Sequence, residues 1–212
     1  RQVLTDIVIG DPRRPDLTIE RAEVVVRHRL GFPAIAAVRI VRPRLFGTYR
    51  DGKLSFGSLD PLIFTGEEGP FELPNFELSV TDGRGLLETD FGQIGISLAG
   101  RGHLRGGFAG ELAATSPRLA LGGCEAARPT LYGRVSIDAA RPRFEGPLRL
   151  TRLECPEQGI GLANAAIEVS ARADKALAAF EGDAGLRASR IAYADNRLAS
   201  IGGTTRFSWR EG

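Results

Sequence analysis

The sequence predicts an all-β protein built as a long antiparallel meander with little helix. Apolar and polar residues alternate every two positions through most of the 212 residues, and short segments rich in Gly, Pro, Asp and Asn separate the alternating runs. Because successive side chains of a strand point to opposite faces, each run has one apolar and one polar face. Gaps of only a few residues favour antiparallel neighbours, since a parallel crossover needs a dozen residues or more.

Residues 1–71 form the N-terminal part of this meander. We expect a turn from Gly10 to Pro15 and a hairpin turn at Asp51-Gly52. Residues 53–71 fit either a strand or a short helix followed by a loop. The expected strands cover residues 2–9, 16–28 and 34–49, the last of them broken or bulged at Pro43.

Residues 72–212 form a repetitive part that we expect to continue the N-terminal strands as one structural unit. Turn signals divide it at Asp82-Gly83, Arg105-Gly106-Gly107, Ala139-Ala140-Arg141-Pro142, Pro156 to Gly159 and Asp195-Asn196.

A Phe-x-Gly motif recurs in this part with a spacing of 36 residues. It starts at Phe108, Phe144 and Phe180. Each period holds two strands, so the three motif strands run in the same direction, with their phenylalanines on one face near one rim.

Composition excludes several classes of protein. Hydrophobic residues make up 42% and charged residues 25%, which argues against a disordered chain. The formal charge is only +2, which argues against a nucleic-acid-binding protein. No stretch approaches 18 consecutive apolar residues, so no transmembrane helix is expected. The chain begins with Arg1 and not with Met, which indicates a processing site or a fragment edge.

An apolar sheet face must be covered. Gly110, Gly133, Gly146 and Gly182 all lie in the apolar phase of their runs. They are consistent with a tightly coiled sheet that leaves space on a concave face for an apolar ligand. They are equally consistent with barrel corners or bulges that bind nothing.

Several phrases of the chain resemble AsmA-like proteins, and most closely the YdbH-like intermembrane phospholipid transport proteins. The resemblance covers nearly the whole chain. It is carried by Leu4–Pro12, Pro15–Val24, Ile40–Leu45, Asp51–Leu62, Phe108–Leu112, Gly122–Cys124, Leu131–Arg134 and Pro142–Leu148.

This resemblance implies a U-shaped (taco-like) hydrophobic β-groove in the periplasm. It implies that acyl chains slide through the groove between the inner and outer membranes while head groups stay in water. The chain would be an N-proximal fragment of a longer protein, anchored to the inner membrane through a segment that the fragment lacks. An outer-membrane lipoprotein is a further expected partner.

We expect the apolar phase of the strands to line the groove and to contact phospholipid acyl chains. The expected lining residues are Phe76, Leu78, Val80, Ile94, Ile96, Leu98, Phe108, Leu112, Leu131, Val135, Ile137, Phe144, Leu148, Leu150, Ile167, Val169, Phe180 and Leu186. The alternative is a closed β-sandwich or barrel for binding or adhesion, in which the same residues form a dry core.

Cys124 and Cys155 are the two cysteines, and a strand at about 130–138 is expected between them. Strands that flank a third lie about 9.5 Å apart, beyond the reach of a disulfide. A bridge therefore requires the rim where the middle strand has not begun, and both cysteines lie beside turn residues there. We expect a disulfide worth on the order of 3 kcal/mol, as suits an oxidising compartment, with two buried reduced thiols as the alternative.

Motifs that indicate catalysis or metal binding are not found. The chain has neither a Gly-x-Ser-x-Gly elbow nor a His-Glu-x-x-His sequence, and its acidic residues are dispersed. Two cysteines without further ligands do not make a zinc site. The sequence therefore predicts a non-enzymatic protein without catalytic residues, metal or cofactor, and a β-rich hydrolase is the least favoured alternative.

Overall fold

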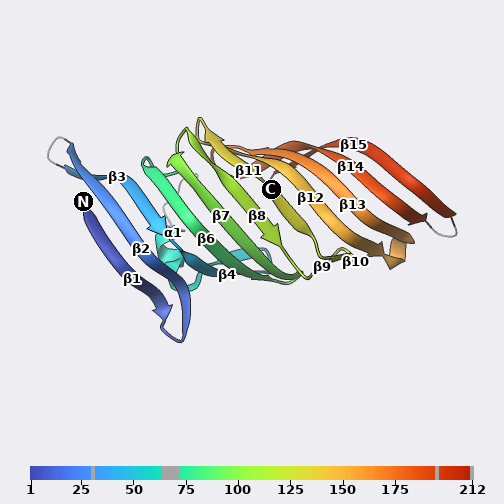
Figure 1. Cartoon of the computed structure of the whole chain (residues 1–212), viewed down its shortest axis with the longest axis horizontal. Coiled ribbons are helices and arrows are strands. Elements are labelled where there is room, and N and C mark those ends of the chain that lie inside the picture. Colours follow the sequence, from blue (N-terminus) through green and yellow to red (C-terminus); the bar gives the residue numbers. More distant parts are fainter. Residues whose placement is uncertain (30–31, 64–71, 194–195, 211–212) are drawn as a thin grey trace.

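The computed structural model describes residues 1–29, 32–63, 72–193 and 196–210, and within them almost the whole chain forms one sheet. Figure 1 shows the strands following one another along the long axis from β1 to β15. The pairing runs from β15 at one end to the β1–β2 hairpin at the other and does not close on itself. The prediction of an open all-β fold is confirmed, and the closed sandwich or barrel is not found.

The elements of the N-terminal half are β1 (Gln2–Asp11), β2 (Arg14–Arg29), β3 (Phe32–Val41), β4 (Arg44–Arg50), β5 (Lys53–Ser55), the 3-10 turn η1 (Gly57–Leu59), α1 (Asp60–Ile63), β6 (Glu77–Thr89) and β7 (Gly92–His103). Those of the C-terminal half are β8 (Phe108–Thr115), β9 (Arg118–Leu121), β10 (Cys124–Ala127), β11 (Thr130–Asp138), β12 (Arg141–Cys155), the 3-10 turn η2 (Pro156–Gln158), β13 (Ile160–Ala173), β14 (Ala179–Tyr193) and β15 (Asn196–Arg210).

The meander is antiparallel except at β6, which pairs in parallel with both β3 and β4. The purely antiparallel prediction is wrong at this point. The chain passes through residues 51–76 between β4 and β6, which is long enough for a parallel crossover. The ambiguous segment after Asp51-Gly52 contains β5, η1 and α1, while residues 64–71 lie outside the described part. The expected boundary at residue 71 falls there and stays a prediction.

Three pairs of short strands each act as one long strand with an interruption. β3 and β4 lie between β2 and β6 in one continuous register, interrupted at Arg42-Pro43 as the sequence predicted. β8 and β9 are likewise interrupted at Ser116-Pro117, and β10 and β11 at Arg128-Pro129. Proline lacks the N–H that a sheet ladder needs, which accounts for a break at each site.

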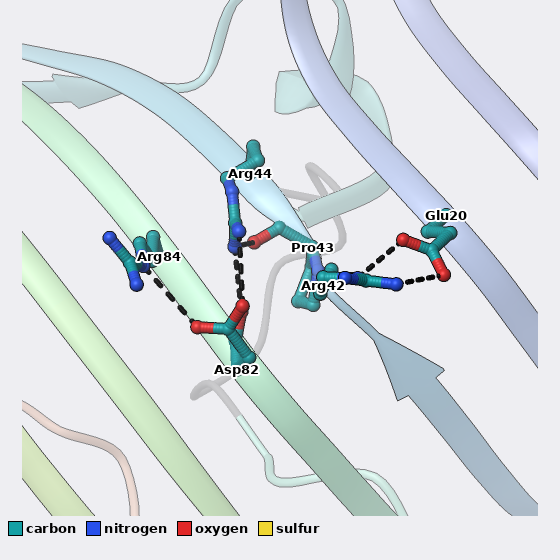
Figure 2. Close-up of polar contacts among 6 residues, drawn as sticks. All are labelled: Glu20, Arg42, Pro43, Arg44, Asp82 and Arg84. Atoms are coloured by element: carbon teal, nitrogen blue, oxygen red, sulfur yellow. Dashed lines mark hydrogen bonds and ion pairs between the residues drawn. The ribbon is translucent and has the colours of Figure 1, made fainter.

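Asp82-Gly83 is not a turn but a bulge inside β6, so the turn prediction there is wrong. The register with β7 shifts between Val80 and Gly83, and Asp82 has a left-handed backbone with φ of +49°. The guanidinium of Arg44 donates to the carboxylate of Asp82 at 3.1 Å and to the carbonyl oxygen of Asp82 at 2.6 Å. Nε of Arg84 lies 3.3 Å from the same carboxylate (Figure 2). Aspartate tolerates this backbone region better than most residues, so the same Asp-Gly pair is typical of turns and bulges alike.

The other predicted turns lie between strands wherever the structure describes them. Arg105-Gly106-Gly107 joins β7 to β8, Ala139-Ala140 joins β11 to β12, and η2 with Gly159 joins β12 to β13. The predicted turn at Asp195-Asn196 includes residue 195, which lies outside the described residues.

Candidate functional site

Cross-strand pairing brings the apolar phases of the strands together on one face of the sheet, called here the apolar face. One row runs Val80, Gly100, Gly110, Val135, Phe144, Ala171, Gly182 and Phe207. A second runs Ile96, Ala114, Leu131, Leu148, Ile167 and Leu186. Directly paired residues point to the same side of a sheet. The predicted lining residues in the strands therefore share this face, and Phe76 packs against Leu104 and Phe108 on it.

Most of this face is half-buried and not sealed. Of the predicted lining residues, Val80, Phe108, Ile137 and Leu150 are buried, Phe180 is exposed, and the others are intermediate. No large side chain in the described part of the chain falls below 2% exposure. Because a packed core buries its large apolar residues almost completely, this face behaves as a surface and not as the interior of a domain.

Seven of the buried apolar residues form two local clusters. Leu104, Phe108 and Ile137 pack with Leu73 and Phe76 at the rim that carries the β7–β8 turn. Leu150, Ala165, Ala188 and Ile191 pack together towards the opposite rim.

Phenylalanine rings cover some glycines of the apolar face, and neighbouring backbone lies close to the others. A methyl group on Gly133 would lie 2.8 Å from Cζ of Phe144, and one on Gly182 would lie 2.8 Å from Cζ of Phe207. Glycine in a strand interior often marks such a close approach. These glycines give space to an aromatic ring or a neighbouring backbone, so of the two alternatives that the sequence allows, open space for a ligand is not found at these positions.

Sequence reasoning missed apolar residues beyond a row of bulges in the C-terminal half. Asn164 in β13 and Arg190 in β14 have left-handed backbones, with φ of +49° and +60°, and interrupt the register between these strands. Across the row the apolar positions step by three residues and not two. Leu153, Leu162 and Ile191 consequently pack against Leu150 and its neighbours on the apolar face. A three-residue step in two adjacent strands was the available signal.

The opposite face, called here the charged face, is covered by ion pairs. Glu23 is buried between Arg1 and Arg39, with Nη1 of Arg39 at 2.9 Å. Arg206 pairs with Asp183 across β14 and β15 at 3.2 Å. Further pairs are Arg42–Glu20, Arg50–Glu88, Arg143–Glu145 and Arg172–Glu181. Exposed pairs of this kind add little stability, but they keep one side of the sheet wetted.

Hydrogen bonds and charges lower the pKa of three carboxyl groups of this face. Hydrogen bonds from Ser58 lower the pKa of Asp16, and the hydrogen bond from Arg44 lowers the pKa of Asp82. Burial by itself raises the pKa of Glu23, but the hydrogen bonds and charges of Arg1 and Arg39 outweigh it, so the pKa lies below its ordinary value. All three carboxylates are thus held ionised by their partners.

A disulfide joins Cys124 to Cys155, with 4.1 Å between their Cα atoms. The bridge lies at the rim before β11 begins, as expected, but the cysteines are on directly paired strands and not on strands that flank β11. β10 pairs directly with the end of β12, in the register that places Cys124 opposite Cys155, while β11 pairs with an earlier part of β12. The bridge therefore links immediate neighbours and fixes the β9–β10 hairpin to the sheet.

Metal-binding and membrane-spanning features were sought in the described residues. No three His, Cys, Asp or Glu side chains there gather into a group that could hold a metal ion. Among these residues no helix has the length and apolarity needed to cross a membrane.

Together these features define an open β-sheet protein with one apolar and one charged face. The family described as YdbH-like, intermembrane phospholipid transport protein YdbH, matches residues 1–212, the whole chain. The chain belongs to this family, and phospholipid transport is thereby supported at the level of the family. A comparison with curated proteins found no match, and neither did a comparison with solved structures.

Proposed function

We propose that the apolar face carries phospholipid acyl chains between membranes and that the protein performs no catalysis. One observation supports this most strongly: apolar residues from β6 to β14 form continuous rows on one face, yet most remain half-buried within the described part of the chain. Acyl chains would cover this surface at about 25 cal/mol per Å² of apolar area removed from water.

Continuity of the face favours movement over tight binding. Neighbouring strands lie about 4.8 Å apart, so a row of leucine, isoleucine and valine side chains offers an acyl chain many equivalent positions. The charged face meanwhile keeps the other side of the sheet in water. We place this activity in the periplasm, with the parent protein anchored in the inner membrane and reaching an outer-membrane lipoprotein.

Substitution of Leu148 tests the proposal. Leu148 lies between Leu131 and Ile167 on the apolar face, whereas Arg149 points to the charged face. Leu148→Asp places a charge among acyl chains and should abolish binding of a phospholipid with a fluorescent acyl chain. Arg149→Asp also introduces a carboxylate into β12 and should leave binding unchanged.

A second variant guards against simple unfolding. Val169→Thr replaces a methyl group with a hydroxyl of similar size at a half-buried position of the apolar face. It should weaken lipid binding several-fold while circular dichroism and the melting temperature stay close to the parent values. Undiminished lipid binding in a folded Leu148→Asp or Val169→Thr protein would count against the proposal.

A further inference from the structure

An aromatic pair stands exposed near one rim of the apolar face. Phe180 of β14 and Trp209 of β15 are directly paired, their ring centroids lie 5.7 Å apart, and they are 39% and 54% exposed. They lie one position in from the last pair of these strands, Ala179 and Arg210. Exposed aromatic pairs at the boundary between an apolar surface and water resemble those at membrane interfaces, where the rings contact both environments.

Arginine residues of the charged face border the same rim, because Arg141 shares the phase of Arg149 in β12 and Arg210 alternates with Trp209 in β15. A hollow of about 400 Å³ is lined by Phe180 and Trp209 together with Arg141, Arg172 and Arg210. Arg141 begins β12 and Arg210 ends β15, so both lie at the rim. Arg172 is paired with Glu181, but within the part of the chain that the structure describes neither Arg141 nor Arg210 lies within 4 Å of a carboxylate.

The charges of the hollow favour one anion. Its three arginines face Asp174 and Glu181, which leaves one formal positive charge. Oδ1 of Asp174 is already occupied by the N–H groups of Ala178 and Ala179. A phosphodiester carries one negative charge, and the planar guanidinium matches two of its oxygens.

We propose that this rim binds the phosphate group of a phospholipid, with Arg141 and Arg210 as ligands and the Phe180–Trp209 pair against the glycerol and first methylenes. The inference rests on the proposed function, because the acyl chains would continue onto the apolar face. It adds a preference: phosphate-bearing lipids bind better than lipids with the same acyl chains and no phosphate.

Trp209 is the single tryptophan of the chain and reports on the site directly. Its fluorescence would be followed while the full chain is titrated with monomeric dihexanoylphosphatidylglycerol or with dihexanoylglycerol. The phospholipid should bind at least about tenfold more tightly, the factor that one or two charge-assisted hydrogen bonds provide. Glycerol 3-phosphate alone distinguishes a free-phosphate site from a lipid site, since a lipid site binds it far more weakly.

Paired substitutions complete the test. The double variant Arg141→Gln/Arg210→Gln should lose the tenfold preference and keep its affinity for dihexanoylglycerol. The control Arg149→Gln/Arg187→Gln removes the same charge from mid-strand positions of β12 and β14 and should keep the preference. Equal affinities for the two lipids in the parent protein, or equal losses in both double variants, would overturn the inference. A separate variant with a photoreactive residue in place of Phe144 would show, by capturing lipid, that the apolar face still binds acyl chains, so the two failures are distinguishable.

Discussion

Arg42, in the interruption between β3 and β4, and Asp82, in β6, occupy equivalent positions, and both have a left-handed backbone, with φ of +51° and +49°. Val41 and Thr81 pair in parallel, and Arg42 and Asp82 follow them directly. The parallel register resumes where Arg44 lies opposite Arg84. Figure 2 shows their side chains leaving in different directions, Arg42 to Glu20 of β2 and Asp82 to Arg44 of β4. The irregularity is therefore shared across strands and is not an isolated defect.

Shared bulges of this kind keep a bent sheet apolar on one side. A methyl group on Gly83 would lie 2.8 Å from Cγ1 of Val80, so both residues face the same side although three positions separate them. Without the extra residue, strict alternation would turn every later side chain of β6 to the other face.

The bulge in β13 gives a direct test of this backbone requirement. Asn164 has φ of +49° and is exposed, so its side chain is free to change. Asn164→Val should lower the free energy of unfolding by about 1–2 kcal/mol, because β-branched residues tolerate the left-handed region poorly. Asn164→Gly adopts that region without strain and should be far less harmful. Denaturant unfolding of the two variants measures the difference in stability. Equal stability would contradict the requirement for a left-handed backbone at position 164.

Acid should destabilise the protein through the charged face. The pKa of Glu23 is lowered in the folded protein from its ordinary 4.5, so the unfolded chain takes up the proton first as pH falls. The stabilisation is complete above about pH 4.5 and is lost as pH falls through the lower folded value. Asp16 and Asp82 act in the same sense below their ordinary 3.8.

Thermal melting between pH 7 and pH 3 measures this effect. Glu23→Gln should remove part of the decline, whereas Glu168→Gln, an exposed carboxylate of the same face, should leave the curve unchanged. A Glu23→Gln protein whose melting temperature falls with acid as steeply as that of the parent would refute the assignment.

Loss of the disulfide should destabilise the protein by about 3–4 kcal/mol, the chain-entropy value for a sequence separation of 31 residues. The effect should be largest in the β9–β10 hairpin, which has only short pairings with β12. Hydrogen exchange of the double variant Cys124→Ser/Cys155→Ser, compared with the parent protein, measures the overall loss of stability and its distribution over the strands. Unchanged protection in β10 would show that strand pairing alone holds the hairpin.

Gly133 and Gly185 should respond oppositely to the same change. A methyl group on Gly133 would meet the carbonyl oxygen of Glu145 at 2.2 Å, whereas one on Gly185 has its nearest neighbour at 4.0 Å. Gly133→Ala should cost about 1–3 kcal/mol through overpacking, and Gly185→Ala should be neutral or slightly stabilising. Chemical denaturation of the two variants compares them, and a harmless Gly133→Ala would argue against the close contact of β11 and β12.

Local patterns predicted those parts of the fold that depend on local chemistry. Alternation around Phe144 and Leu148 placed both in the apolar phase, and Ala139-Ala140 was placed in a turn, because each depends on neighbours within a few residues. Asp82-Gly83 was misassigned because the same residues suit a turn and a bulge. Only the partner strands, which are distant in sequence, decide between the two.

Features that arise between strands could not be read from single segments. The parallel pairing of β6 with β3 and β4 depends on where the chain returns after residue 63, and the covering of Gly133 by Phe144 depends on register. The sequence predicts the rim position of the cysteine pair but not the β9–β10 hairpin, which makes the two cysteines direct neighbours. All three features depend on the register between strands that are distant in sequence, and not on the preferences of single residues.

Photocrosslinking at Phe144 and Glu145 tests the central claim most directly. The two residues are adjacent in β12 and point to the apolar and the charged face, respectively. A photoreactive residue at position 144, in protein held in a cell envelope, should capture phospholipid, and the same residue at position 145 should not. Capture at neither position, or equal capture at both, in folded protein would contradict the account of an apolar face that carries lipid.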